Sequence, residues 1–359
     1  MKRLRMVLGG PRGGLGGAQR IVECLERRLT REGWDVEWFG PANVPRVRTS
    51  QRYPGLNEGL RALAVRAALR RLPRADMTLS HGMYGLGTPG RRIHVFHGTF
   101  PGLVEACRSR LPRLDTLVMR WFNGTLEQLS GVGALRVAVS RQVVDEVKTY
   151  FGLSCHETIH NAVDVAHLSR AAGGRDLRAQ FGLPAGRQLI VTVGRMDYGK
   201  GLETVRAMLP LLPERAHLVL AVPSAAEAER VSDLPNTTVI PGVPYEQLPD
   251  LYEACDVLLC PSRYEGFGLT LLEAWAAGKP VVTGRVGIVR ELQGREPRFD
   301  CCVREVADAA GLAEAIRGLL NDPEQSRGQG GWGRSLVAEQ FDVQRFERDY
   351  LTAIQRALA

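Results

Sequence analysis

Two glutamates eight positions apart flank a glycine-rich turn in the second half of the sequence. Glu265 precedes Gly266 and Gly268, and Glu273 follows them. Glycines permit a tight turn and a close approach of the backbone to a ligand. A helical pattern begins at Leu269, and the N–H groups at a helix start favour a diphosphate. A carboxylate accepts hydroxyl hydrogen bonds, as a ribose diol offers. The pattern predicts a sugar-diphosphate site, or else an ordinary strand, loop and helix with two surface glutamates.

Two cations follow a second strand-like run, at residues 188–194. Arg195 comes directly after Gly194, and Lys200 lies five residues further on, next to Gly201. Fixed cations beside the same phosphates would neutralise the charge that develops on a leaving diphosphate. The alternative is a solvated Arg and Lys pair in a strand-to-helix loop.

Two histidines directly follow strand-like runs in the first half. His81 comes after Ser80, and His97 comes after Phe96. In open α/β sheets, the carboxyl ends of the strands line the ligand crevice. Both histidines are therefore candidates for the site, although a single histidine in such a position is more often structural.

The elements that position these residues read as two sets of buried parallel strands, because short apolar runs are repeatedly flanked by turn residues. The first set covers residues 4–8, 35–39, 77–80, 93–96 and 137–139, and the second covers 188–194, 217–222, 238–240, 257–259 and 280–283. The pattern predicts an α/β protein with two doubly wound, Rossmann-like domains facing a central cleft. We assign residues 1–170 to an N-terminal domain and residues 175–340 to a C-terminal domain. A linker covers 171–174, and a terminal helix over 341–359 is expected to pack back on the N-terminal domain.

The net charge of +8 is unevenly distributed along the 359 residues. Residues 1–150 hold 25 basic and 12 acidic side chains, a net +13, and the remainder carries −5. This asymmetry favours an anionic partner such as a membrane surface or an acidic acceptor, unless the arginines are simply solvated. Nucleic acid is not expected, because no recognition motif accompanies the charge. An arginine-flanked helix over residues 57–74 is either a lipid-docking helix or an ordinary domain helix.

The seven cysteines are scattered and form no Cys-x-x-Cys pair, which disfavours a disulfide framework or a structural zinc site. No uncharged apolar stretch is long enough to cross a bilayer. We therefore expect a cytoplasmic protein, with peripheral contact at the inner face of a membrane as a further expectation.

The run from Pro261 to Val282 resembles the signature of retaining GT-B glycosyltransferases of sequence family four, which reads Pro-Ser-x-x-Glu-Gly-Phe-Gly, four variable residues, then Glu-Ala-x-Ala-x-Gly-x-Pro-Val-Val. The resemblance implies that the N-terminal Rossmann-like domain, residues 1–170, binds the acceptor and that the C-terminal one, residues 175–340, binds the nucleotide sugar. It implies that Glu273 binds the nucleotide ribose. It implies that Glu265 holds the transferred sugar and diphosphate together with the N–H groups of Gly266, Phe267, Gly268 and Leu269. The segment from Gly194 to Gly201 is similar to the family's Gly-Arg-x4-Lys-Gly motif, so Arg195 and Lys200 take a phosphate-clamping role. Val243 is also assigned to the donor site.

The glycine-dense loop at residues 9–20 resembles the family's Gly-Gly-x-Glu-Arg segment at the first helix, with Gln19 in place of the glutamate. It does not fit a dinucleotide fingerprint, which would need glycine at position 19. The resemblance places the backbone of Gly16 and Gly17 near the donor phosphate and Arg20 on the acceptor side. It also implies that His97 faces the transferred sugar as a catalytic residue and that His81 lies on the acceptor side.

The expected reaction is transfer of a hexose-like sugar, with retention, from a UDP- or GDP-linked donor to an unknown acceptor hydroxyl. A membrane-associated or cell-envelope glycan and a natural product are both candidate acceptors. No Asp-x-Asp motif occurs, and the family works without a bound metal, so neither a metal nor a cofactor is expected. One alternative is a GT-B epimerase or hydrolase of sugar nucleotides. The other is an inactive binding subunit, and the complete set of charged site residues argues against this second alternative.

Overall fold

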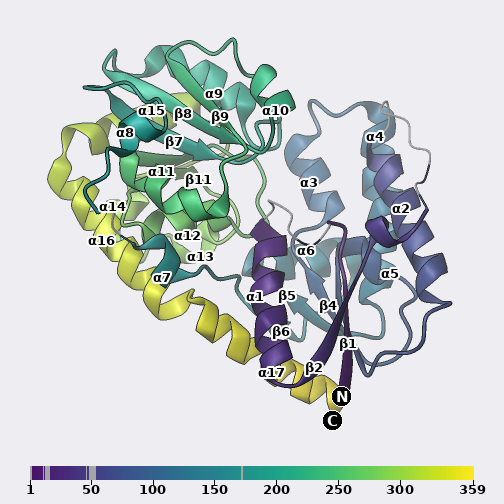
Figure 1. Ribbon diagram of the computed structural model, residues 1–359. Helices are drawn as coiled ribbons and strands as arrows, with labels where there is room; N and C mark the ends of the chain where they lie inside the picture. The colour runs from purple at the N-terminus through teal and green to yellow at the C-terminus, as the bar shows by residue number, and fades with distance from the viewer. Residues whose placement is uncertain (1, 11, 13–16, 46, 48–53, 171–172) are drawn as a thin grey trace. The chain divides into compact units, whose positions relative to one another are not determined.

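The computed structural model describes residues 2–10, 12, 17–45, 47, 54–170 and 173–359, and the chain forms two compact units. Unit 1 comprises Met1–Asn161 and Val343–Ala359, and unit 2 comprises Ala162–Asp342. Each unit has one six-stranded parallel sheet with helices packed against it (Figure 1). These are the two doubly wound α/β domains that the sequence predicts.

Unit 1 has the strand order β2-β1-β3-β4-β5-β6. Helices α1 and α17 pack together on one face of this sheet, and α2 and α5 contribute to a core on the other (Figure 1). The strands are β1 (Lys2–Val7), β2 (Trp34–Phe39), β3 (Met77–His81), β4 (Arg92–Phe96), β5 (Leu135–Ala138) and β6 (Glu157–Thr158). The helices are α1 (Gly17–Arg31), α2 (Pro54–Leu69), α3 (Phe100–Cys107), α4 (Arg113–Leu117), α5 (Gly124–Gly131), α6 (Arg141–Phe151) and α17 (Val343–Leu358), with the π-helix η3 (Val118–Asn123) and the 3-10 turns η1 (Pro41–Asn43) and η2 (Gly82–Gly85).

Unit 2 has the strand order β12-β11-β10-β7-β8-β9. Its strands are β7 (Gln188–Val193), β8 (Ala216–Val222), β9 (Thr237–Pro241), β10 (Val257–Cys260), β11 (Val281–Gly284) and β12 (Val303–Arg304). Its helices are α7 (Val165–Leu168), α8 (Leu177–Gln180), α9 (Leu202–Met208), α10 (Ala225–Glu229), α11 (Leu248–Ala254), α12 (Leu269–Ala276), α13 (Val289–Leu292), α14 (Pro297–Asp300), α15 (Ala309–Asn321) and α16 (Pro323–Gln340), with the 3-10 turns η4 (Leu209–Leu211) and η5 (Tyr245–Gln247).

The strand order of unit 2 reverses direction at β7, which pairs with β8 on one side and β10 on the other. In an open parallel sheet, such a reversal opens a crevice at the carboxyl ends of the two strands, where ligands bind. The loops that follow β7 and β10 both leave this point. They carry the two motifs that the sequence singles out, residues 194–201 and 261–268.

The apolar runs become strands because both faces of each sheet are covered. Leu189, Ile190 and Val191 in β7 are buried, and β10 is buried along its whole length. A strand covered on both faces reads as a continuous apolar run, which is why the sequence locates the ten longer strands. The two-residue strands β6 and β12 escape prediction because two residues carry no periodicity.

The boundary between the units lies at Asn161 and Ala162, before the linker expected at residues 171–174. Of that linker, Ala171 and Ala172 lie outside the described residues. The segment ahead of it already belongs to unit 2, because α7 contacts α11 and α12. Helix α17 belongs to unit 1, where it contacts α1 and β4.

The arginine-flanked helix predicted over residues 57–74 is α2, and it is an ordinary domain helix. Ala62, Val65 and Leu69 are fully buried in a core that includes Val7 and Phe39. These apolar side chains of α2 are used in packing, which disfavours the lipid-docking alternative for this helix. Among the helices in the described part of the chain, none combines the length and apolar character needed to span a bilayer.

Candidate functional site

Lys200 and Glu265 meet at the sheet reversal of unit 2. The Lys200 ammonium donates to Glu265 Oε1 over 2.6 Å, and Ser262 Oγ donates to the same oxygen over 2.7 Å. The two side chains are 31% and 16% exposed, so the pair faces solvent at one edge only. Burial works against the charged ammonium, but the neighbouring Glu265 carboxylate outweighs it and raises the pKa of Lys200. The lysine therefore stays charged at neutral pH.

The two loops that carry this pair are fastened to each other. The Arg263 N–H donates to the Gly199 carbonyl over 2.9 Å, and the Arg263 guanidinium lies 4.4 Å from the centre of the Tyr198 ring. Gly201 has a φ of +87°, and a Cβ there would collide with the carbonyl oxygen of Pro261. Only glycine combines this left-handed backbone with so close an approach. The glycine after the lysine is thus a packing requirement that holds the lysine in place.

Arg195 is the outer cation of the same loop. Its guanidinium lies 3.3 Å from Asp197 Oδ2 and is mostly exposed. Asp197 Oδ1 also accepts the backbone N–H of Lys200 over 3.0 Å. Asp197 therefore orders the loop and holds Arg195 near Lys200, a role that sequence reasoning did not assign.

The glycine turn after Glu265 ends in the first residue of α12. Gly268 is in the left-handed region with a φ of +106° and precedes Leu269, where the helix starts as predicted. The Phe267 ring is buried and lies 6.0 Å from the Phe341 ring. The glycine turn thus leads directly into the start of α12 at Leu269, and the first turn of a helix can bind an anion through its N–H groups.

Glu273 lies in the second turn of α12 and is only 2% exposed. Its Oε2 accepts a hydrogen bond from the Tyr252 hydroxyl of α11 over 2.8 Å. A buried carboxylate with this partner is held in one orientation. The sequence predicted Glu273 but not Tyr252. The two residues are 21 positions apart on different helices, and no motif links them.

The other residues assigned to the donor and acceptor lie in both units. Val243 is half-buried in the loop that follows β9 of unit 2. In unit 1, Gly17 is the first residue of α1, and Arg20 lies in its first turn. Gly16 lies outside the described residues.

His81 and His97 form a pair in unit 1. The His81 Nδ1 and the His97 Nε2 are 2.7 Å apart, and the rings stack with their centres 5.0 Å apart. Burial lowers the pKa of His97 to about 4 and, together with His97 and His94, holds the pKa of His81 well below its usual range. One ring nitrogen must donate and the other accept, so the pair cannot be doubly protonated. At neutral pH both rings are therefore neutral.

A buried acid, Glu127, is hydrogen-bonded to the segment that follows His97. Glu127 of α5 accepts the backbone N–H of Phe100, the first residue of α3, over 3.0 Å. Burial raises the pKa of Glu127 to about 8, although the Phe100 N–H opposes the shift. Thr99 caps α3 and also donates to Glu146 over 2.8 Å. Sequence reasoning missed Glu127, since a single glutamate in an apolar helix carries no motif.

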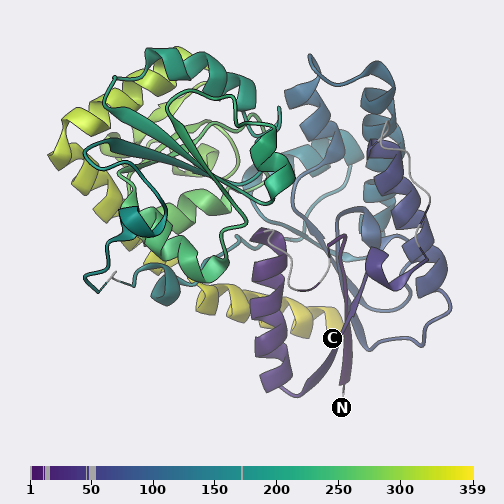
Figure 2. The same ribbon diagram turned by 45° about the horizontal axis from the view of Figure 1, so that its top comes forward.

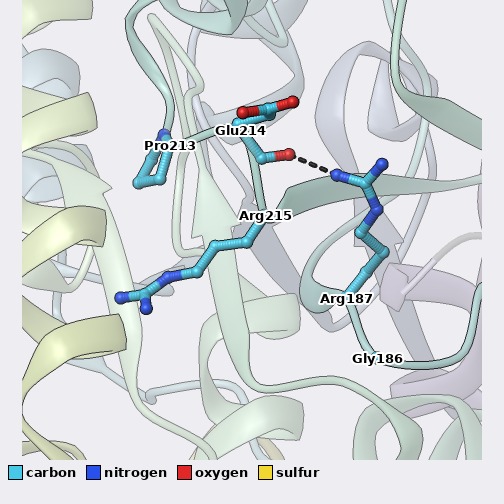
Figure 3. Close-up of a pocket in the computed structure, with 5 residues that line it drawn as sticks. All are labelled: Gly186, Arg187, Pro213, Glu214 and Arg215. Carbon is cyan, nitrogen blue, oxygen red and sulfur yellow. Dashed lines mark hydrogen bonds between the residues drawn. The ribbon is translucent and has the colours of Figure 1, made fainter.

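A hollow of about 510 Å³ in unit 2 lies at the opposite end of the sheet. Its lining residues are Gly186, Arg187, Pro213, Glu214 and Arg215, which precede β7 and β8 (Figure 3). The Arg187 guanidinium donates to the Glu214 carbonyl across it. Because it lies at the amino ends of the strands, this hollow is separate from the Lys200 and Glu265 pair.

The fold and this arrangement define a GT-B protein. Residues 15–167 match the family model described as Glycosyltransferase Family 4, and residues 187–322 match the model described as Glycosyl transferases group 1. The two matches together cover most of the sequence, one for each sheet. The chain belongs to this family of GT-B glycosyltransferases.

Proteins similar in sequence to this chain carry glycosyltransferase names. The chain is 28% identical over 364 residues to the D-inositol 3-phosphate glycosyltransferase 1 of Catenulispora acidiphila, which covers 88% of this chain and 85% of that protein. It is 32% identical over 221 residues to the glycogen synthase of Mycobacterium tuberculosis, covering 58% of this chain. The chain spans only 50% of the length of that glycogen synthase.

Solved structures share the fold of the whole chain. The sucrose-phosphate synthase of Thermosynechococcus elongatus has a TM-score of 0.80 at 21% identity, with 99% of both chains covered. HepE of Anabaena, solved with UDP and glucose, has a TM-score of 0.74 at 16% identity and covers 99% of this chain. At these identities, the likeness shows the fold alone.

Proposed function

We propose that the protein is a retaining glycosyltransferase that moves a hexose-like sugar from a UDP- or GDP-linked donor to an acceptor hydroxyl. The observation that carries the proposal is the convergence of Lys200 and Glu265 beside the first turn of α12. A cation, a carboxylate and helix N–H groups at one sheet reversal are the groups that a sugar diphosphate requires. The glycosyltransferase names of the relatives and the UDP and glucose bound to HepE support the same conclusion.

In this proposal, the donor is held by residues of unit 2. An ammonium has three N–H donors, so Lys200 can keep Glu265 and still bind a phosphate oxygen, with Arg195 as the second cation. Among the described residues, Lys200 and Ser262 both use Glu265 Oε1, so Oε2 can accept a sugar hydroxyl. Glu273 binds the nucleotide ribose, and Tyr252 fixes the orientation of its carboxylate.

The proposed reaction is a displacement on one face of the sugar. The bond from the anomeric carbon to the departing phosphate oxygen breaks while the bond to the acceptor oxygen forms on the same side. The acceptor proton passes to the departing phosphate oxygen. Lys200, Arg195 and the first N–H groups of α12 stabilise the charge that develops on the phosphate. In unit 1, His97 is proposed as a catalytic group, and His81 and Arg20 as acceptor-binding groups.

The proposal is tested with a panel of UDP-, GDP- and ADP-sugars, first by thermal shift and then by nucleotide release. A true donor at 100 times its Kd should stabilise the protein by about 2.7 kcal/mol. Proton NMR of the product reports whether the anomeric configuration is kept. If no nucleotide sugar stabilises the protein, the proposal that it is a glycosyltransferase is refuted. Nucleotide release without an acceptor would indicate a hydrolase or epimerase.

A conservative variant tests the ribose contact without damaging the fold. Because Glu273 is buried, alanine there would leave a cavity and an unpaired Tyr252 hydroxyl. Glu273→Gln keeps an acceptor for Tyr252 but removes the charge, and we expect weaker donor binding with little loss of stability. The matched control is Tyr252→Phe, which removes the partner and leaves the carboxylate charge. Donor affinity unchanged in Glu273→Gln would remove Glu273 from the site.

A further inference from the structure

The crossover from β4 to β5 in unit 1 exposes a row of large apolar side chains. Leu114 and Leu117 of α4 are 49% and 56% exposed, and Trp121 of η3 is 66% exposed. Their spacing of three and four residues places them on one side of a continuous helical segment. Soluble proteins expose single apolar side chains freely, but a row of three that includes a tryptophan indicates an interaction surface.

The other side of the same segment is fully used in packing. Met119 lies against Gly55 and Phe122 against Gly59, both in α2. Asn123 is buried and donates to the Gly55 carbonyl over 2.8 Å. Helices α2 and α3 contact the segment as well (Figures 1 and 2). The exposed row is therefore held on a firm support and is not a frayed end.

Basic side chains predominate among the exposed charges around the row. Arg108, Arg110 and Arg113 are exposed just before it. Asp115, within the row's own helix, is buried on the packed side. Glu105 lies 3.3 Å from Arg120, so its charge is compensated within the pair. The surface thus combines apolar side chains with three exposed arginines that form no ion pair with any residue of the described ranges.

We propose that this surface, Arg108 to Arg113 with Leu114, Leu117 and Trp121, binds an anionic lipid bilayer. The arginines lie at the level of the headgroups, and the three apolar side chains enter the boundary with the acyl chains. A helix with an apolar side, basic flanks and a tryptophan is suited to that position. The proposal does not depend on the donor or on transfer, because it concerns a separate surface of unit 1.

Vesicle co-sedimentation tests the proposal without any sugar nucleotide. The wild-type chain should bind vesicles of phosphatidylglycerol and phosphatidylcholine, and bind pure phosphatidylcholine far more weakly. Each arginine near an anionic surface contributes about fivefold in affinity, so R108Q/R110Q/R113Q should lose about 100-fold. The matched control R70Q/R71Q/R74Q changes the same charge at exposed positions after α2 and should lose less than threefold.

The apolar contribution needs its own variants. L114S/L117S/W121S should lose at least about 100-fold in vesicle affinity, whereas Leu211→Ser, at a side chain 44% exposed in unit 2, should lose none. Vesicles should shift the tryptophan fluorescence of the wild type to the blue, and Trp121→Phe should abolish that shift. Circular dichroism and thermal unfolding of each variant in solution check that its fold is intact.

Three results would overturn the proposal. The first is absence of binding to anionic vesicles by the wild type, and the second is equal loss in the two arginine variants. The third is a concentration-dependent dimer in light scattering that L114S/L117S/W121S disrupts, which would assign the row to contact with a second copy.

Discussion

The Lys200 and Glu265 pair allows the structural and the chemical role of one contact to be separated. The ion pair is 2.6 Å long and its side chains are 31% and 16% exposed, between a surface pair and a fully buried one. Exposed pairs contribute about 0 to 1 kcal/mol, and breaking a buried pair costs about 3 to 5 kcal/mol. Lys200→Met should therefore lower the free energy of unfolding by about 2 kcal/mol.

Glu265→Gln should cost less, about 1 kcal/mol, because the amide oxygen still accepts from Lys200 and Ser262. The double variant K200M/E265Q leaves no unpaired charge, so its stability should be higher than the sum of the single changes predicts, by about 1 to 2 kcal/mol. Urea unfolding of the four proteins gives this coupling. Arg206→Met, which removes an exposed contact with Asp233 in the same unit, is the control and should change stability by about 0.5 kcal/mol or less.

Activity separates the two roles. If Lys200 stabilises a departing diphosphate, Lys200→Met should lower kcat/KM by roughly 100-fold or more, about 3 kcal/mol of barrier, and the double variant should not regain it. If Lys200 only orders the loop, Lys200→Met should keep its kcat/KM within about threefold of the wild type under conditions where both proteins are fully folded. Recovery of turnover in K200M/E265Q, or a coupling below about 0.5 kcal/mol, would refute the reasoning.

Three further predictions follow from single residues. Gly201→Ala should cost about 3 kcal/mol or more, because a Cβ there meets the Pro261 carbonyl in addition to the strain of a positive φ. Gly194→Ala has open space and only the strain of its φ of +127°, so it should cost less, about 1 to 3 kcal/mol; thermal unfolding compares the two variants. The pKa of His97 is depressed to about 4 from 6.5, so the stability that its neutral ring contributes is present above pH 6.5 and is lost as pH falls toward 4. The free energy of unfolding, measured in urea, should fall by about 2 kcal/mol from pH 7 to pH 5 through this residue, and His97→Gln should show a smaller fall. The pKa of Glu127 is raised to about 8 from 4.5, so the stability that the neutral acid contributes is present below pH 4.5 and lost as pH rises through 8. Urea unfolding at pH 8 should find Glu127→Gln more stable than the wild type by about 4 kcal/mol. Equal or lower stability would contradict the buried neutral acid.

The parts of the site that lie close together in sequence were predictable. The glycine turn, the start of α12 at Leu269 and the cations after β7 all follow from local spacing, and so do the ten longer strands. Contacts made through sheet register were not. His81 and His97 meet because β3 and β4 pair with Ser80 opposite His94, and neither sequence segment specifies that register.

Burial was the other quantity that the sequence did not determine. Leu114, Leu117 and Trp121 have the spacing of a helix face that normally packs inward, yet this face is exposed. The arginine-flanked helix α2 has the composition of a surface helix, yet Ala62, Val65 and Leu69 are buried. Spacing shows that a helix has two faces, and only the tertiary packing decides which face meets solvent.

Unit 1 is built from two stretches of chain separated by the whole of unit 2. During synthesis, the six strands of its sheet leave the ribosome first, while α17, which contacts α1 and β4, follows only after Asp342. The sheet surface of unit 1 that α17 covers therefore stays exposed while some 180 further residues are synthesised. Unit 2 meets no such delay, and its two ends adjoin, since the Val163 N–H donates to the Phe341 carbonyl over 2.9 Å. Unit 2 can thus be completed as an inserted, self-contained piece before unit 1 closes.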